Sequence, residues 1–263
     1  MKERLEMTLE EIKGEYPYLY ETHMHTSEAS ACGKCDGRSM ARAYKENGYT
    51  GVIVTDHNWG GNTAIDRSLP WKEWIDEFFK GYEAVKAEGE KIGLQVFQGY
   101  EAGYHGPEFL IYGFTTEIMK RFPELKEATV EEQLKIVHSF DGMVIQAHPF
   151  READYIDRVI TYEKYVDGLE IVNASHSNPS DGSRNRCVYD ERAIELSKKC
   201  NLPGTAGSDQ HSTVPLFGGV AFKTPLNDIH DYIYRIKNKQ DYVITNGRQW
   251  FTKEGDLLLT CKD

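Results

Sequence analysis

Long apolar segments are missing from this 263-residue sequence, in which 40% of the residues are hydrophobic and 28% are charged. No segment approaches the roughly 20 consecutive apolar residues that a membrane-spanning helix needs, so we expect no membrane association. The first residues, MKERLEMTLEEIKGEY, are charged and lack the apolar core of a signal peptide. We therefore expect a globular protein that stays in the cytoplasm.

The whole chain has only five cysteines, which is an odd number. This count fits reduced thiols better than a framework of disulfides. Cys32 and Cys35 form a C-x-x-C pair, but no second C-x-x-C and no H-x-x-x-H accompanies them. The sequence therefore does not complete a zinc knuckle.

Positive charge is outnumbered, because 31 Lys and Arg face 42 Asp and Glu and give a formal net charge of −11. This balance disfavours long nucleic acids as partners, since their binding depends on basic residues that neutralise phosphates. A small anionic substrate stays compatible with it, because bound metal ions can reverse the potential inside one pocket.

Several common catalytic and nucleotide-binding motifs are also absent. The chain has no G-x-S-x-G, which argues against a serine nucleophile on a strand-to-helix turn. It has no G-x-G-x-x-G and no Walker A sequence, so the usual loops for dinucleotides and nucleoside triphosphates are missing.

Short apolar runs of strand type alternate with helical patterns along the chain. The predicted strands are 18–22, 51–55, 94–97, 109–112, 143–146, 168–172, 203–206 and 219–222. The predicted helices are 39–47, 71–88, 130–140, 189–200 and 227–237, the third opened by a capping box of Thr129 and Glu132. This order predicts a single α/β domain over residues 1–263, with a parallel sheet that closes into a barrel.

Histidine and acidic residues follow the ends of these predicted strands. His23 and His25 lie two apart at the end of the first strand, so their side chains point to the same side. Residues in corresponding places after later strands are Asp56, His57, Glu101, His148, Asp209 and His211. Taken singly, each pattern has a simpler explanation, such as a chance H-x-H or an Asx-type cap at Asp56.

The recurrence of the pattern at strand ends favours a metal centre. The carboxyl ends of parallel strands share one face, so these side chains are expected to converge on one pocket. Imidazole and carboxylate together suit zinc, manganese or iron, and the set is larger than one ion can use. We therefore predict a centre of two or three divalent metal ions.

These ordered motifs resemble those of the PHP (polymerase and histidinol phosphatase) domain family. The resemblance spans roughly residues 19–222, through HMHT at 23–26, TDHN at 55–58, Glu101, AHP at 147–149 and SDQH at 208–211. It implies a distorted (β/α)7 barrel, a binuclear or trinuclear metal site and hydrolysis of phosphate esters. Carried over by position, it makes metal ligands of His23, His25, His57, Glu101, His148, Asp209 and His211.

Two ligand positions of the family match this sequence less closely. Many members carry another histidine shortly after the H-x-H, where this chain has Ala31 or, with one inserted residue, Cys32. Cys32 is either a thiolate ligand or a buried structural thiol. A further ligand falls on the strand after Glu101, where Glu108 is the first candidate and His105 the second.

Cationic and polar residues near the strand ends are candidates for binding the substrate's phosphate. Arg151 follows His148 by three residues and is predicted to be both catalytic and substrate-binding. Asn173, His176 and Arg186 are further substrate-binding candidates. Each of these residues is equally compatible with an ordinary place in a surface loop.

The predicted reaction is hydrolysis of a small phosphate ester by attack of a metal-bound hydroxide. Asp209 is expected to hold an ion and orient the water, Asp56 to steady neighbouring ligands, and Arg151 to neutralise charge on the phosphate. Histidinol-phosphate phosphatase, nucleotide phosphatase and small exonuclease activities remain open as alternatives. So does a non-catalytic, metal-stabilised module that binds a partner.

Overall fold

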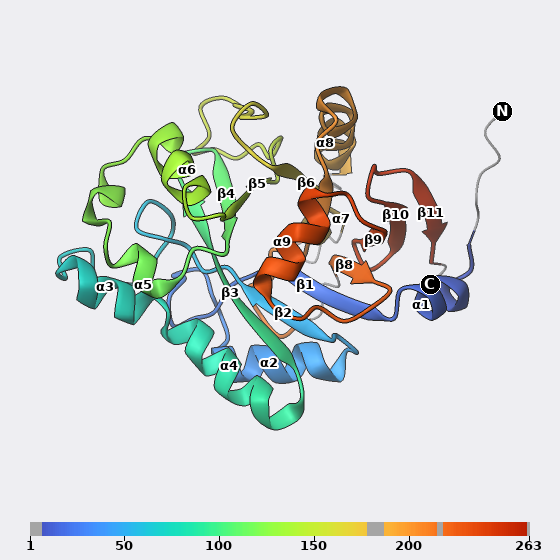
Figure 1. The fold of residues 1–263 in the computed structure, drawn as a ribbon, viewed down its shortest axis with the longest axis horizontal. Coiled ribbons are helices and arrows are strands. Elements are labelled where there is room, and N and C mark those ends of the chain that lie inside the picture. The colour runs from blue at the N-terminus through green and yellow to red at the C-terminus, as the bar shows by residue number, and fades with distance from the viewer. Residues whose placement is uncertain (1–6, 178–186, 215–217, 262–263) are drawn as a thin grey trace.

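The strands form one mixed sheet in a computed structural model that describes residues 7–177, 187–214 and 218–261. Within these residues the sheet has eleven strands in the order β11-β10-β9-β8-β1-β2-β3-β4-β5-β6-β7 (Figure 1). The strands are β1 Tyr18–Met24, β2 Gly51–Val54, β3 Gln95–Gly103, β4 Glu108–Tyr112, β5 Met143–Ala147, β6 Gly168–Asn173, β7 Gly204–Gly207, β8 Gly219–Phe222, β9 Tyr242–Thr245, β10 Gln249–Thr252 and β11 Leu257–Thr260.

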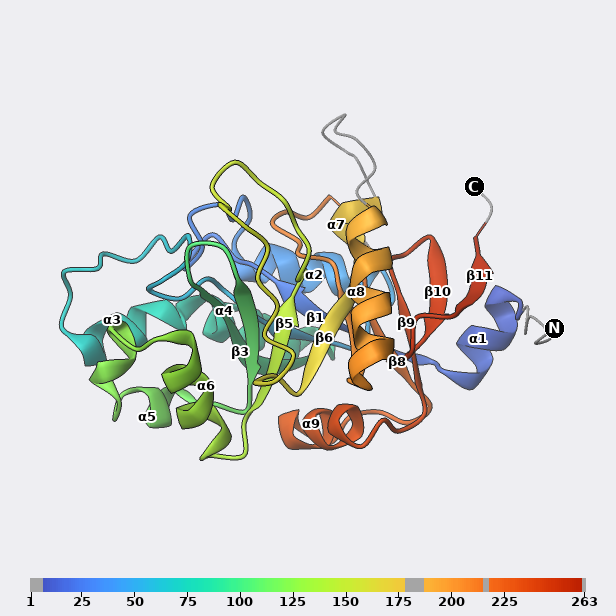
Figure 2. The ribbon, with the colours of Figure 1, turned by 90° about the horizontal axis from the view of Figure 1, so that it is seen from above.

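Helices cover the sheet and both of its ends. They are α1 Leu9–Glu15, α2 Gly37–Glu46, α3 Trp71–Phe78, α4 Lys80–Ile92, α5 Thr116–Met119, α6 Val130–His138, α7 Ala174–Ser177, α8 Cys187–Cys200 and α9 Ile229–Lys237, with a 3-10 turn at Pro123–Lys126. In Figure 2, α3, α5 and α6 lie at one end of the molecule, and α1 lies with β9–β11 at the other. None of the helices in the described ranges combines the length and the apolar character needed to cross a membrane.

All eight predicted strands are present, and four of the five predicted helices recur with small changes at their ends. The capping box of Thr129 and Glu132 at the start of α6 is confirmed. The single helix predicted over 71–88 is wrong, because Phe79 interrupts it with a ψ of 6° and separates α3 from α4. The ring of Phe79 is buried by this break, so tertiary packing decides the boundary.

The sheet is mixed, which corrects the expectation of a parallel sheet. Strands β1, β2 and β3 are parallel, as are β5, β6 and β7, but β4 runs antiparallel to both β3 and β5. Only residues 104–107 join β3 to β4, and a parallel pair needs a crossover of a dozen or more residues. Strand β8 likewise pairs antiparallel with β1.

The sheet curls until β1 and β7 meet at their carboxyl ends. The Thr22 hydroxyl donates to the Ala206 carbonyl at 2.8 Å. Beyond the strands, the Asp209 amide donates to the His23 carbonyl and the His25 amide to the Gln210 carbonyl, both at 2.9 Å. The curl therefore brings the first histidine motif of the chain, at residues 23–26, beside the last one, at residues 208–211.

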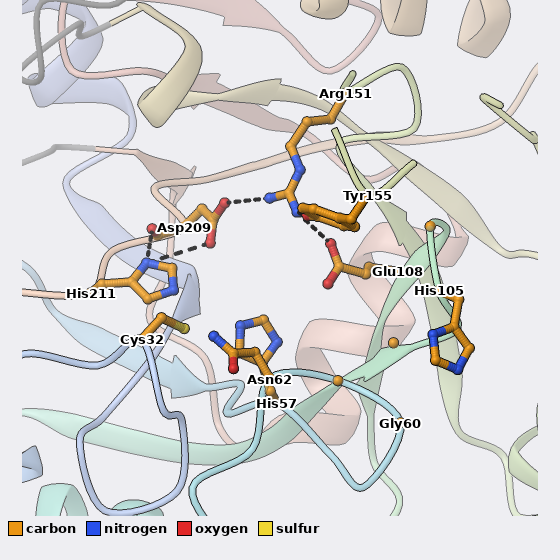
Figure 3. A pocket seen from close by; sticks show the side chains of 13 residues that line it. Cys32, His57, Gly60, Asn62, His105, Glu108, Arg151, Tyr155, Asp209 and His211 are labelled. Carbon is orange, nitrogen blue, oxygen red and sulfur yellow. Dashed lines mark hydrogen bonds and ion pairs between the residues drawn. The ribbon is translucent and has the colours of Figure 1, made fainter. Parts of the chain in front are cut away.

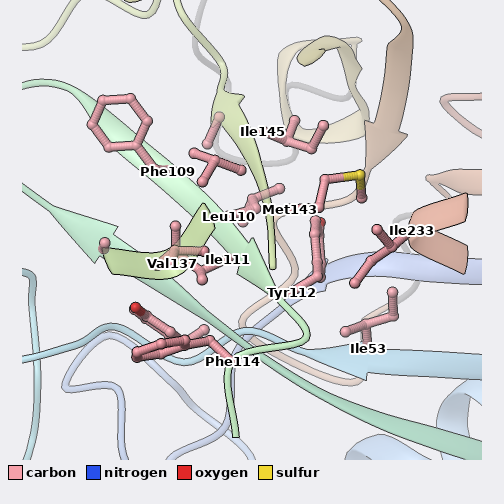
Figure 4. Close-up of a cluster of buried hydrophobic side chains, with 14 of the residues drawn as sticks. Ile53, Phe109, Leu110, Ile111, Tyr112, Phe114, Val137, Met143, Ile145 and Ile233 are labelled. Carbon is pink, nitrogen blue, oxygen red and sulfur yellow. The ribbon is translucent and has the colours of Figure 1, made fainter. Parts of the chain in front are cut away.

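A hydrophobic core fills the space between the curled sheet and the helices. Figure 4 shows side chains of β4 and β5 packed with residues of α6 and α9. Phe109, Ile111, Ile145 and Val137 are fully buried in this cluster. Burial of a side chain of this size contributes roughly 1.5–3 kcal/mol, so the core fixes the strand ends on which the polar residues sit.

Candidate metal centre

The structure brings together all eight residues predicted as metal ligands. They lie at one edge of the sheet, in or just beyond β1, β2, β3, β5 and β7, and at the start of β4. Potential ligand atoms lie within 4.8 Å of one another in four overlapping groups: His25, His57 and His211; His23, His25 and Glu101; His23, His148 and Asp209; and His57, Glu101 and Glu108. Their role as ligands stays a prediction, but their convergence is a feature of the fold.

Glu108 reaches this edge because β4 is antiparallel. It pairs with Gly103 at the end of β3 and with Ala147 at the end of β5. The first residue of an antiparallel strand thus lies beside the last residues of its neighbours. Its carboxylate Oε2 lies 3.6 Å from Nε2 of His148.

Several buried polar atoms converge on this space without making hydrogen bonds. Nε2 of His23, His25 and His148 and both carboxylate oxygens of Glu101 have no hydrogen-bond partner within the described part of the chain. Both His23 Nε2 and His148 Nε2 lie 3.3 Å from Glu101 Oε1. Unpaired buried polar atoms are costly, whereas lone pairs aimed at shared cations are satisfied. These residues therefore fit divalent metal ions.

Glu170, in the middle of β6, sets the direction of two of these histidines. Its Oε1 lies 2.9 Å from Nδ1 of His23, and its Oε2 accepts the backbone amide of His148 at 3.0 Å. An imidazole that donates Nδ1–H to a carboxylate presents Nε2 as the ligand atom. Asn173 donates from Nδ2 to Glu170 Oε2 at 2.9 Å and so steadies the carboxylate.

Glu21 links the ends of β1 and β7 through hydrogen bonds that its carboxylate accepts from both. Its Oε1 accepts the backbone amides of His23 at 2.8 Å and of Ser208 at 2.9 Å. Its Oε2 accepts the hydroxyls of Ser208 at 2.5 Å and Tyr44 at 3.1 Å. Complete burial nonetheless outweighs these bonds and raises the pKa of Glu21 to about 7.

Asp56 steadies the turn that follows β1, as expected for a residue that supports the ligands. Its carboxylate accepts the amide and the hydroxyl of Thr26 at 2.6 and 2.8 Å, and the Ser30 hydroxyl at 2.7 Å. The same Ser30 oxygen accepts the His57 backbone amide at 3.0 Å. Burial raises the pKa of Asp56 to about 6 despite these bonds.

Two carboxylates at the centre, those of Glu101 and Asp209, are held in their ionised form by the histidines around them. Burial raises the pKa of Glu101, but His23, His57 and His148 outweigh it and hold the pKa well below its ordinary value. The pKa of Asp209 is lowered in the same way by the surrounding histidines. By contrast, burial and the neighbouring imidazoles lower the pKa of His25, which favours its neutral, metal-binding form.

A cavity of about 470 Å³ opens onto this centre. Figure 3 shows Arg151 reaching across it between two carboxylates. One terminal nitrogen of Arg151 lies 2.9 Å from Glu108 Oε2, and the other lies 3.6 Å from Asp209 Oδ2. The exposed ring of Tyr155 lies against the guanidinium, with its centroid 5.7 Å away. Arg151 and Tyr155 therefore form part of the wall of the cavity, together with histidine and acidic side chains.

Known structures share this arrangement of elements. No protein-family profile matches the sequence, and no curated protein sequence matches it significantly. A two-domain protein of Bacteroides vulgatus that contains a predicted PHP-like metal-dependent phosphoesterase is 14% identical with a TM-score of 0.63, over 93% of this chain and 69% of that one. The chain has a PHP-like fold. PsfC from Pseudomonas syringae is 17% identical with a TM-score of 0.51, over 82% of this chain and 87% of that one.

Two predicted substrate-binding residues, Asn173 and His176, do not line the cavity of this PHP-like fold. Asn173 is fully buried and holds Glu170, and His176 Nδ1 lies 2.7 Å from Asp190 Oδ1 behind the centre. Neither is among the residues that line the cavity, whereas His105 does line it. Arg186 lies outside the described residues.

Three residues of the site were not predicted from the sequence. Glu170 and Glu21 lie inside strands, where the sequence pattern shows only an apolar run interrupted by a charge. A charged residue within a fully buried strand is itself a signal, because such residues are almost never buried without a partner. Tyr155 lies in a long loop, and nothing in the local sequence indicates that this loop overhangs the PHP-like centre.

Proposed function

We propose that the protein is a metal-dependent phosphoesterase that hydrolyses small phosphate esters with two or three divalent ions of zinc, manganese or iron. One observation carries the proposal: unpaired, buried imidazole and carboxylate atoms converge directly beside the guanidinium of Arg151. Such a centre would concentrate positive charge in one cavity of an otherwise acidic protein. A phosphate ester is the substrate that needs both metal ions and a guanidinium.

Glu101 and the histidines around it would hold the ions. The four overlapping groups of potential ligands exceed the coordination of a single ion, which supports two or three. When bound, the ions would supply an activated water and polarise the phosphate oxygens. The ionised carboxylates of Glu101 and Asp209 favour cation binding before any substrate arrives.

Arg151 and Asp209, whose charged groups lie 3.6 Å apart in the wall of the cavity, would both act on the substrate. Besides its two carboxylate contacts, Arg151 donates a hydrogen bond to the hydroxyl of Tyr155. Its side chain lines the cavity, and its guanidinium would neutralise charge that develops on a phosphate oxygen there. Asp209 would orient the attacking water, because its low pKa keeps the carboxylate an acceptor.

Two further parts of the proposal concern the whole chain. We propose that the chain is one distorted (β/α)7 domain over residues 1–263 that works in the cytoplasm. The continuous curled sheet of the described residues supports the single domain, and the odd number of five cysteines fits a reducing compartment. The main alternative is a non-catalytic module that binds a partner through its metal-stabilised fold. The cavity at the centre, with Arg151 in its wall, favours catalysis over structural closure.

The deciding experiment combines metal analysis with a substrate screen. Purified protein is analysed for bound metals and then assayed with zinc, manganese or iron on a panel of aryl phosphates, phosphomonoesters and phosphodiesters. We expect hydrolysis of an aryl phosphate that depends on added metal and is lost on chelation. Full metal loading without turnover on the panel would favour the binding module.

A further inference from the structure

Cys32 lies beside two of the converging histidines, in the turn that follows β1. Its thiol interacts with the imidazoles of His57 and His211. Figure 3 shows the sulfur pointing toward the space between these two rings. All three residues line the cavity, so the thiol faces the centre and not the protein interior.

The other cysteine of the C-x-x-C pair has a different environment. Cys35 packs at the edge of an apolar cluster with residues of α2 and β2, and its Sγ lies 3.8 Å from the Thr213 hydroxyl. Cys32 belongs to none of the apolar clusters of the described residues. A structural thiol behaves as a small hydrophobic side chain, which describes Cys35 and not Cys32.

The backbone holds Cys32 in place against both histidine loops. The amide of Ala31 donates to the Asn62 carbonyl at 2.8 Å, and the amide of Lys34 donates to the carbonyl of His211 itself at 2.7 Å. Gly33 permits the tight turn between them, because a Cβ there would lie 2.5 Å from the Thr26 carbonyl oxygen. The thiol is therefore preorganised toward the two imidazoles before any ligand binds.

The three histidines at this place are arranged to share a cation. The ring of His25 stacks on the rings of both His57 and His211, each with centroids 4.3 Å apart. One potential ligand atom of each histidine lies within 4.8 Å of those of the other two. Nε2 of His25 lies 3.2 Å from Asp209 Oδ1, and Nδ1 of His57 lies 2.7 Å from Glu101 Oε2, so carboxylates surround the same space.

We propose that the Cys32 thiolate is a ligand of the divalent ion that His25, His57 and His211 are placed to share. This inference rests on the proposed function, because it concerns an ion of the same centre. A thiolate with imidazoles is a ligand set of zinc and other thiophilic ions, and manganese prefers oxygen ligands. The ion at this position is therefore of the zinc type, even where the neighbouring positions accept manganese.

The first test uses the unaltered protein. Cobalt(II)-loaded protein is expected to show intense thiolate-to-metal charge-transfer absorption in the near ultraviolet. Zinc loading is expected to slow alkylation of Cys32 by iodoacetamide at least tenfold, followed by peptide mass spectrometry, while Cys35 reacts at the same rate with and without zinc. A loaded protein without the absorption, or with Cys32 unprotected, overturns the proposal.

Variants at the two cysteines provide the matched comparison. Cys32→Ser is expected to lose the charge-transfer absorption and one metal equivalent per chain, whereas Cys35→Ser keeps both. Cys32→His is expected to recover the metal content but not the absorption. Near-ultraviolet circular dichroism checks that the variants fold. If a variant does not fold, the tests on the unaltered protein still decide the proposal.

The outcomes separate this inference from the proposed function. Protein that binds metal and hydrolyses phosphate esters without a charge-transfer band overturns the thiolate ligand alone. Protein that binds no divalent metal at all overturns both proposals.

Discussion

Nδ1 of His23 lies 2.9 Å from Oε1 of Glu170, and both side chains are fully buried. The contact leaves Nε2 of His23 free to face the centre. A carboxylate behind a metal-binding histidine fixes the ring and raises its basicity. The quality of the proposed metal centre therefore depends on a residue that does not face the cavity.

Replacing this carboxylate tests its role. We expect Glu170→Gln to weaken divalent metal binding roughly 10- to 100-fold, because the amide keeps the shape but loses the charge that orients His23. Isothermal titration of metal into chelator-treated protein measures the change. Glu195→Gln, an exposed position on α8, is the matched control and is expected to bind metal normally. Equal affinities for the two variants would assign Glu170 a purely structural role.

Asp209→Asn tests the centre itself. The substitution preserves size but removes a charge that holds cations and orients the water, so we expect the rate to fall at least roughly a hundredfold while the fold survives. Steady-state hydrolysis of an aryl phosphate and metal analysis measure both effects. His230→Asn, exposed on α9, is expected to change neither. Full activity and metal content in Asp209→Asn would contradict the assignment of the centre.

Arg151→Ala separates substrate binding from metal binding. A charge-assisted hydrogen bond contributes about 1.5–3 kcal/mol, so we expect kcat/KM to fall roughly 10- to 100-fold. Metal content is expected to stay unchanged, because Arg151 is not a ligand. Arg158→Ala, an exposed arginine of the same loop, is the control for general changes in charge. Unchanged kinetics would place Arg151 among ordinary loop residues.

Glu21 makes the stability of the metal-free protein depend on pH. Burial raises its pKa from the ordinary value of 4.5 to about 7. A raised pKa means that the folded state binds the proton more tightly than the unfolded state does. The corresponding stability is fully present below pH 4.5 and is lost as the pH rises through about 7.

Glu21→Gln is the variant that isolates this effect. Its amide can keep the backbone hydrogen bonds and donate to the hydroxyls of Ser208 and Tyr44 without carrying charge. We compare the free energy of unfolding of the variant with that of the unaltered protein at each pH. As the pH rises through this window, we expect the difference to change in favour of the variant by up to roughly 3 kcal/mol. Urea unfolding in the presence of a chelator measures it. Parallel pH profiles for the two proteins would contradict the raised pKa.

Much of the candidate site could be predicted from the sequence because its candidate ligands follow strand ends. An apolar run marks a strand, and the polar residue just beyond it falls at the edge where a parallel sheet gathers such residues. This argument found His148 and Asp209 without knowledge of their neighbours. Strand β4 runs antiparallel to its neighbours, and its first residue, Glu108, therefore lies at the same edge as the last residues of β3.

Other parts depend on contacts that local sequence does not carry. The partner of Glu170 is His23, which lies 147 residues away, so the pattern of β6 alone shows an unexplained buried charge. Strands β9–β11 were missed because their burial depends on packing against α1 and β8, which the local sequence does not show. The direction of β4 was predictable in principle, since the four residues before it allow only a hairpin.

The contact between β1 and β7 also has a consequence for the order of folding. Thr22 and Ala206, which join these strands, are 184 residues apart in the sequence, whereas β3, β4 and β5 pair with near neighbours. Long-range closure is entropically slower than local pairing. We therefore expect β3, β4 and β5 to pair early in folding and to bring Glu101, Glu108 and His148 together. At that stage His23 and Asp209 are still apart. Pulse-labelled hydrogen exchange during refolding would then protect β4 amides before those of β7, and a chain halted between the two stages would present half a metal centre.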